Sequence, residues 1–225
     1  MPLARSDFRF LHRLRVRWAE VDLQKIVFNP HYLMYLDTAL ADYWRAMGLP
    51  YEPTLAALGG ELFVKKATLE YHASAVYDDY LDVGLRCARV GNTSMQLQGG
   101  IFRGDQLLVA AELVHVFADP LSRTPLTVPT VLRQTMEGFD AGGSVVDLQT
   151  GSWVDLGDAV RTLRTPEAQD HGALHAVVRN SLGLTIAAAR LLPQAVAADA
   201  VVELPLVAGA GWGDTAARAV VLAAA

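Results

Sequence analysis

FNPHYLMYLDTALADYWRAMGLP, residues 28–50, carries the clearest secondary-structure signal in the chain. Asn29 suits an N-cap, and Pro30 suits the first helical position because the N–H that proline lacks would have no partner there. Gly48 and Pro50 suit the end of a helix, since glycine accepts a left-handed conformation and proline cannot continue the helix. Between these ends, apolar residues recur at three- and four-residue steps: Leu33, Leu36, Leu40, Tyr43 or Trp44, and Met47. The sequence therefore predicts one long helix with its apolar stripe against a core.

The segments around this helix are typical of strands. Residues 11–18 alternate between apolar and basic side chains and predict a first strand, followed by a loop over 20–28. After an irregular piece at 51–60, we expect four further strands, at residues 61–71, 81–90, 93–102 and 107–117, and a short helix at 130–138. A long helix followed by strands joined through short turns predicts an α+β fold, with an antiparallel sheet packed on the helix.

A change in composition divides the chain. Residues 1–140 form the first predicted domain, and the small and polar residues of 141–150, with a glycine pair, predict a linker. Residues 151–225 form the second predicted domain, which becomes rich in alanine over 187–200 and 216–225.

Composition and charge exclude several classes of protein. The formal net charge is −5 with no long run of one sign, which argues against nucleic-acid binding. Cys87 is the only cysteine, so no internal disulfide can form, and we expect a reducing, cytoplasmic environment. We expect no membrane-spanning segment and no metal site, because the histidines lack ligand spacing.

Four stretches, at residues 15–37, 71–84, 89–98 and 115–129, resemble the hotdog-fold acyl-CoA thioesterases, in the branch of 4-hydroxybenzoyl-CoA thioesterase and YbgC-like proteins. The first stretch, RVRWAEVDLQKIVFNPHYLMYLD, carries most of the resemblance. It implies a hotdog fold, in which an antiparallel sheet wraps around the long helix. It also implies a homodimer or tetramer with active sites at the subunit interface. The substrate would be an acyl-CoA, with no separate cofactor because CoA is part of the substrate.

The resemblance implies that Asp22 is the catalytic carboxylate and that the Asn29 backbone N–H polarises the thioester carbonyl. Physical chemistry is consistent with these roles, because the first N–H groups of a helix lack intrahelical partners and favour negative charge. We expect Asn29, His31 and Tyr32 to offer such donors. Asp22 could act as a general base or as a nucleophile, and the sequence leaves both open. His31 is either a second acid–base group or a surface residue of the first turn.

Further substrate contacts follow from the same resemblance. The Gly91, Thr93 and Ser94 hairpin would lie near the pantetheine arm, although a plain turn explains these residues equally well. Lys25 stands where relatives usually have glycine, and it could narrow the loop, pair with Asp22 or contact a CoA phosphate. This departure keeps an alternative open: a non-catalytic protein that binds acyl-CoA or an acyl carrier.

The second domain resembles the N-terminal half of a GNAT acetyltransferase. The resemblance lies in a helix near residues 152–164, a strand and hairpin over 173–193, and a glycine-rich stretch at 208–213. Ala208 occupies the position where that family has arginine or glutamine, and the chain ends where later strands should begin. We therefore predict a partial GNAT-like α/β domain that is degenerate and non-catalytic.

Overall fold

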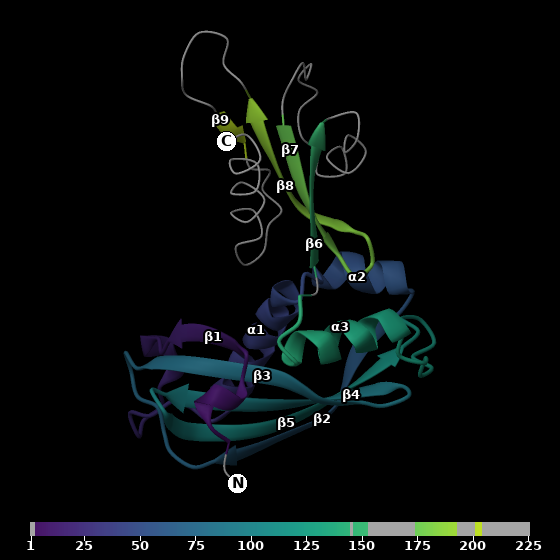
Figure 1. Ribbon diagram of the computed structural model, residues 1–225. Helices are drawn as coiled ribbons and strands as arrows, with labels where there is room; N and C mark the ends of the chain where they lie inside the picture. The colour runs from purple at the N-terminus through teal and green to yellow at the C-terminus, as the bar shows by residue number, and fades with distance from the viewer. Residues whose placement is uncertain (1–2, 145, 153–173, 193–200, 204–225) are drawn as a thin grey trace. The chain divides into compact units, whose positions relative to one another are not determined.

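The computed structural model of the chain describes residues 3–144, 146–152, 174–192 and 201–203 (Figure 1). Two compact units are present. The first comprises Met1–Trp44 and Tyr51–Gly143, and the second comprises Arg45–Pro50 and Ser144–Ala225. Within the described residues each unit contains its own antiparallel sheet, so each is considered separately.

The first unit has the α+β architecture that the sequence predicts. Its sheet is antiparallel throughout, in the order β1-β3-β4-β5-β2. The strands are β1 (Phe10–Arg15), β2 (Glu61–Tyr71), β3 (Tyr80–Val90), β4 (Ser94–Arg103) and β5 (Gln106–Ala118). The helices are α1 (Pro30–Ala46), α2 (Tyr51–Leu58) and α3 (Thr130–Asp140), with short 3-10 turns η1 (Arg5–Asp7) and η2 (Trp18–Glu20). None of the helices in the described residues is long and apolar enough to cross a bilayer.

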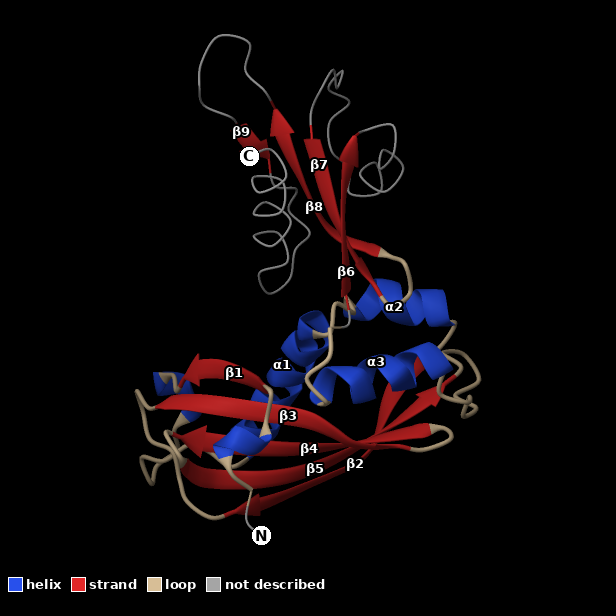
Figure 2. Ribbon diagram, viewed as in Figure 1, coloured by secondary structure: helices blue, strands red, loops and turns tan. Residues whose placement is uncertain are grey.

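Helix α1 lies against one face of this sheet (Figure 2). A glycine makes the close approach possible, because a Cβ at Gly99 on β4 would come within 2.7 Å of Leu36 Cδ2. The buried residues of α1 are Tyr32, Tyr35, Leu36, Ala39, Leu40, Tyr43 and Trp44. The apolar stripe predicted for this helix is therefore wrong at its N-terminal end. Leu33 is 41% exposed, because the first turns of α1 face the core with Tyr32 and Tyr35 instead.

Two further predictions for the first unit are also wrong, one on the end of a strand and one on the type of an element. The strand expected over residues 11–18 ends at Arg15, because the Arg17 N–H bonds the Glu20 carboxylate at 2.7 Å and the chain turns into η2. The piece expected to be irregular forms α2. Pro53 lies in the first turn of α2, where a missing N–H breaks no helical hydrogen bond.

The second unit contains a sheet in the order β6-β7-β8-β9. Its strands are β6 (Val146–Ser152), β7 (Leu174–Asn180), β8 (Thr185–Leu192) and β9 (Val201–Glu203). The linker expected over 141–150 is therefore wrong for its second half, since Val146 and Leu148 alternate with polar residues and residues 146–150 belong to a strand. The hairpin expected within 173–193 is present, with the Asn180 side chain accepting the Leu184 N–H at 2.9 Å. The helix expected near 152–164 and the glycine-rich stretch 208–213 lie outside the described residues.

Candidate active site

The loop that carries Asp22 is a tight hairpin between η2 and α1. Val21 and Val27 form an isolated antiparallel bridge, and the Asp22 N–H donates to the Ile26 carbonyl at 2.9 Å. The Asp22 carboxylate accepts the Gln24 N–H at 2.8 Å through Oδ1. Its Oδ2 has no hydrogen bond to any described residue. Asp22 therefore makes a local turn contact and still keeps one carboxylate oxygen available to a ligand.

Glu20 anchors this loop to α1. Its side chain is only 3% exposed and accepts hydrogen bonds from the Arg17 N–H, the Arg17 guanidinium and the Tyr35 hydroxyl. Burial opposes the charge of Glu20, but these hydrogen bonds outweigh burial and lower the pKa of the carboxyl. The Glu20 carbonyl also accepts the Phe28 N–H at 2.9 Å. Both ends of the Asp22 loop are thus held by one buried residue, Glu20, which has a structural role.

The N-terminus of α1 leaves one backbone donor free. The His31 N–H donates to the Phe28 carbonyl at 2.9 Å, and the Tyr32 N–H donates to the Asn29 carbonyl at 3.3 Å. Among the described residues the Asn29 N–H has no acceptor, and Asn29 is exposed. The expectation of three donors is therefore wrong for His31 and Tyr32, because a turn at the start of the helix uses their amides. The one free N–H is that of Asn29, which the resemblance implies polarises the thioester carbonyl.

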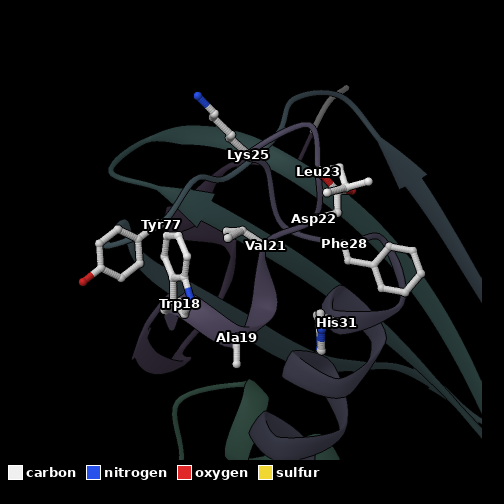
Figure 3. A pocket seen from close by; sticks show the side chains of 9 residues that line it. All are labelled: Trp18, Ala19, Val21, Asp22, Leu23, Lys25, Phe28, His31 and Tyr77. Atoms are coloured by element: carbon white, nitrogen blue, oxygen red, sulfur yellow. The ribbon is translucent and has the colours of Figure 1, made fainter.

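Asp22, Lys25 and His31 line one cavity of about 1030 Å³, which we call the loop cavity (Figure 3). Exposed apolar side chains also contribute to its walls, among them Trp18, Leu23, Phe28 and Tyr77. The Trp18 and Tyr77 rings meet edge to face with centroids 5.8 Å apart. An apolar cavity with few polar groups is typical of a ligand site.

Lys25 does not pair with Asp22. In Figure 3 its side chain extends away from the other labelled residues, and it forms no ion pair within the described part of the chain. Its backbone has a φ of +63°, the left-handed conformation that glycine adopts without strain. The turn requires a left-handed residue at this position, which explains why a glycine would suit it.

Tyr32 is buried in the first turn of α1. The side chain is 2% exposed, and its hydroxyl oxygen accepts the Ala75 N–H at 2.8 Å. Burial raises the pKa of the Tyr32 hydroxyl. Because Ala75 also accepts the Val27 N–H, Tyr32 fixes the segment on which the Asp22 loop rests. Tyr32 thus supports the loop, and its contact with substrate stays a prediction.

The other expected contacts lie outside the loop cavity. Gly91, Thr93 and Ser94 form the turn between β3 and β4, with the Gly91 N–H donating to the Ser94 carbonyl at 2.7 Å. The Arg133 guanidinium holds the Gly91 carbonyl at 2.7 Å. Within one chain, the structure does not bring this turn together with Asp22.

Comparison with known proteins relates part of the first unit to a family. Residues 24–110 match the Thioesterase superfamily model. The chain is similar to the acyl-CoA thioester hydrolase YbgC of Escherichia coli O6:H1, with 27% identity over 117 residues, which are 52% of this chain and 87% of the relative.

Solved structures share the fold of the first unit. The PA5185 protein of Pseudomonas aeruginosa is 29% identical with a TM-score of 0.52, over 63% of this chain and 96% of that one. The SAV2348 protein of Staphylococcus aureus, solved in complex with CoA, is 14% identical with a TM-score of 0.54, over 60% and 85% of the two chains. The first unit therefore has the hotdog fold of these structures, residues 24–110 within it match the thioesterase superfamily, and these similarities support thioester hydrolysis as its reaction.

Proposed function

We propose that the chain hydrolyses acyl-CoA thioesters at the N-terminus of α1, with Asp22 as the reacting carboxylate and the Asn29 N–H as the oxyanion donor. One observation carries this proposal: Asn29 has an unused N–H at the helix end, directly after the loop that presents Asp22. A backbone donor fixed at the positive end of a helix stabilises negative charge that develops on a carbonyl oxygen.

Two routes are consistent with these groups. In the first, Asp22 removes a proton from water and the water oxygen bonds to the carbonyl carbon. The tetrahedral oxyanion lies at the Asn29 N–H; the C–S bond then breaks, and the CoA thiolate takes up the proton. In the second, Asp22 itself attacks, expels the thiolate and forms a mixed anhydride that water hydrolyses. A single turnover in ¹⁸O-labelled water tests for the anhydride: label in the Asp22 carboxylate establishes it, with water attacking the Asp22 carbon, whereas the general-base route labels only the released acid.

Similarity supports CoA as the thiol half of the substrate. The YbgC relative is named for acyl-CoA thioester hydrolysis, and the SAV2348 neighbour binds CoA in its structure. The loop cavity offers aromatic walls near the mouth where a long pantetheine arm would pass.

A panel of acyl-CoA thioesters, read by release of free thiol, tests the reaction. The matched variant is Asp22→Asn, whose side-chain oxygen can still accept the Gln24 N–H, so the turn should persist. We expect kcat/KM to fall by roughly 10²- to 10⁴-fold on loss of the carboxylate. Circular dichroism checks that the variant keeps the wild-type fold.

Asp105→Asn is the control, because Asp105 lies in the exposed β4–β5 turn and undergoes the same chemical change. A wild-type protein that binds acyl-CoA but hydrolyses none of the panel would establish the binding-only alternative. Full activity in Asp22→Asn would refute the assigned carboxylate.

We further propose that the chain works as a homodimer formed along β2. This strand is at the edge of the sheet, is eleven residues long and pairs only with β5. Residues 64–68 are exposed, and Val64 is 63% exposed. A long edge with exposed apolar side chains is a template for pairing with another strand. A second copy of the chain would also bring its own residues close to the N-terminus of α1.

Charge placed on this edge should weaken the dimer. Thr68→Lys puts two like charges near each other across a two-fold axis, so we expect the monomer fraction to rise in sedimentation equilibrium. Thr127→Lys is the matched control on an exposed loop. Equal association of both variants and the wild type would exclude β2 as the contact.

A further inference from the structure

Tyr71, the last residue of β2, contacts the start of α1. Its hydroxyl donates a hydrogen bond to the Asn29 carbonyl at 3.3 Å. That carbonyl belongs to the residue whose own N–H is the proposed oxyanion donor, and it also accepts the Tyr32 N–H at 3.3 Å. The backbone of Asn29 is therefore held at its carbonyl, while its N–H has no acceptor among the described residues.

The Tyr71 ring supports the loop that carries the proposed reacting carboxylate. It meets the buried Tyr32 ring edge to face, with centroids 5.6 Å apart. The Tyr32 hydroxyl accepts the Ala75 N–H, and the Ala75 carbonyl accepts the Val27 N–H at the end of the Asp22 loop. One side chain thus contacts the helix end through its hydroxyl and supports the Asp22 loop through its ring.

Packing in the core does not explain the Tyr71 hydroxyl. Tyr71 is 50% exposed, at a position where β2 pairs with Val109 of β5. A hydroxyl this exposed can bond water in the folded and the unfolded chain, so a long hydrogen bond to a carbonyl contributes little to the free energy of unfolding. The bond does fix a direction, and an oxyanion donor must point at the developing charge before the reaction begins.

Building on the thioesterase function proposed above, we propose that Tyr71 is a positioning residue that aligns the Asn29 N–H with the thioester carbonyl. Tyr71 acts through Asn29 and touches no reacting atom. The Asn29 N–H matters more to the tetrahedral intermediate than to the bound substrate, so a misaligned donor lowers kcat and leaves KM unchanged. A displacement of about 1 Å near the reacting atoms costs about 10²-fold in rate.

The first test is Tyr71→Phe, which removes the hydroxyl and keeps the ring against Tyr32. We expect kcat for the best acyl-CoA thioester to fall about fivefold, the value of one hydrogen bond, with KM and the free energy of unfolding unchanged. Tyr71→Leu also loses the ring, so its kcat should fall by about 10²-fold. Tyr80→Phe is the matched control, because Tyr80 is similarly exposed in the same unit and undergoes the same chemical change.

A second test does not depend on turnover. The ¹H–¹⁵N residual dipolar coupling of Asn29, measured in a weakly aligned sample, reports the direction of its N–H bond. We expect this coupling to change in Tyr71→Phe and to stay at the wild-type value in Tyr80→Phe. The couplings of the later turns of α1 should be the same in all three proteins.

Wild-type kcat in Tyr71→Phe would overturn the proposal, as would an unchanged Asn29 coupling. So would a rise in KM at constant kcat, because the hydroxyl would then bind substrate, or a fall in kcat accompanied by lost stability, because it would then support the fold. If the wild-type protein hydrolyses no acyl-CoA, the proposed function fails by itself. The Asn29 coupling then still decides whether Tyr71 sets the direction of that N–H.

Discussion

Lys25 adopts a backbone conformation that an L-amino acid with a Cβ rarely adopts. Its φ of +63° lies in the left-handed region, and its N–H closes the turn by donating to the Asp22 carbonyl at 2.9 Å. A left-handed residue other than glycine costs about 1–2 kcal/mol. The turn that presents Asp22 is therefore built with a residue that destabilises it.

Lys25→Gly should raise the free energy of unfolding. Relief of the left-handed backbone is partly offset by the greater flexibility of glycine in the unfolded chain, which leaves a net gain of about 0.5–1 kcal/mol. Urea denaturation measures it. Lys25→Ala removes the same charge but keeps a Cβ, so it should show no such gain. Equal stability of the two variants would show that the lysine side chain, and not the backbone, matters.

Sequence reasoning selected Asp22 and Asn29 as candidate reacting residues but could not predict their hydrogen bonds. Asp22 could be chosen from its place before the Asn-Pro corner, and it does line a cavity near the helix end. Which amide stays free could not be chosen, because that depends on the turn from Phe28 to His31. Tyr71 carried no signal either: its hydrogen bond to Asn29 depends on how the end of β2 meets α1, and only coordinates show that.

At the scale of elements, Glu20 joins η2 to α1. The Tyr35 hydroxyl donates to Glu20 Oε2 at 2.8 Å, and Arg17 contacts the same carboxylate at 2.6 Å. The Arg17 side chain is largely exposed, so the buried hydrogen bonds from Tyr35 and the Arg17 N–H supply most of the stabilisation. Loss of this link would free one end of the Asp22 loop.

Glu20→Gln should lower the free energy of unfolding by about 1–3 kcal/mol at neutral pH, since hydrogen bonds to a charged acceptor are lost. The pKa of Glu20 is lowered in the folded state, so its contribution is complete above the ordinary value of 4.5 and is lost as pH falls through the folded pKa. The difference between variant and wild type should therefore shrink in acid. Urea denaturation at neutral pH and well below 4.5 checks this.

Glu70→Gln, at an exposed position of β2, is the control and should leave stability unchanged at both pH values. A difference between Glu20→Gln and the wild type that persists undiminished in acid would mean that the carboxylate charge is not the source of the stabilisation.

Element types were more predictable than their ends. The helix from Pro30 and the four strands of 61–117 follow directly from the spacing of apolar residues, because packing against the core requires one apolar face on each element. The first strand was predicted too long because alternation alone cannot show that Glu20 captures the Arg17 N–H. The start of β6 was predicted to belong to a linker because Gly142 and Gly143 precede it among small polar residues.

On the scale of the whole molecule, the first unit matches complete relatives. The PA5185 structure is covered over 96% of its own length by 63% of this chain. The order of strands and helix was enough to predict an α+β fold with an antiparallel sheet packed on one long helix, whereas the hotdog fold itself was implied by the family resemblance. The GNAT-like origin of the second unit stays a prediction, because most of the residues that suggested it lie outside the described ranges.

A chain shortened after Gly143 should keep the thioesterase reaction. All the residues assigned to catalysis and to the loop cavity precede that point, and Arg45–Pro50 remain in the shortened chain. We expect kcat/KM for the best acyl-CoA to be unchanged, as measured by thiol release beside the full-length protein. A folded but inactive shortened chain would show that the second unit contributes to the chemistry.

The order of strands in the first sheet also sets the order in which it can be assembled during synthesis. Both β1 and β2 pair with strands made later, and Glu61 of β2 faces Ala118, the last residue of β5. The meander from β3 to β5 closes through short turns, whereas β2 must wait for nearly sixty further residues to leave the ribosome. Until then α1 has no complete sheet to cover its apolar side. The exposed apolar surface makes the nascent chain prone to aggregation during this interval.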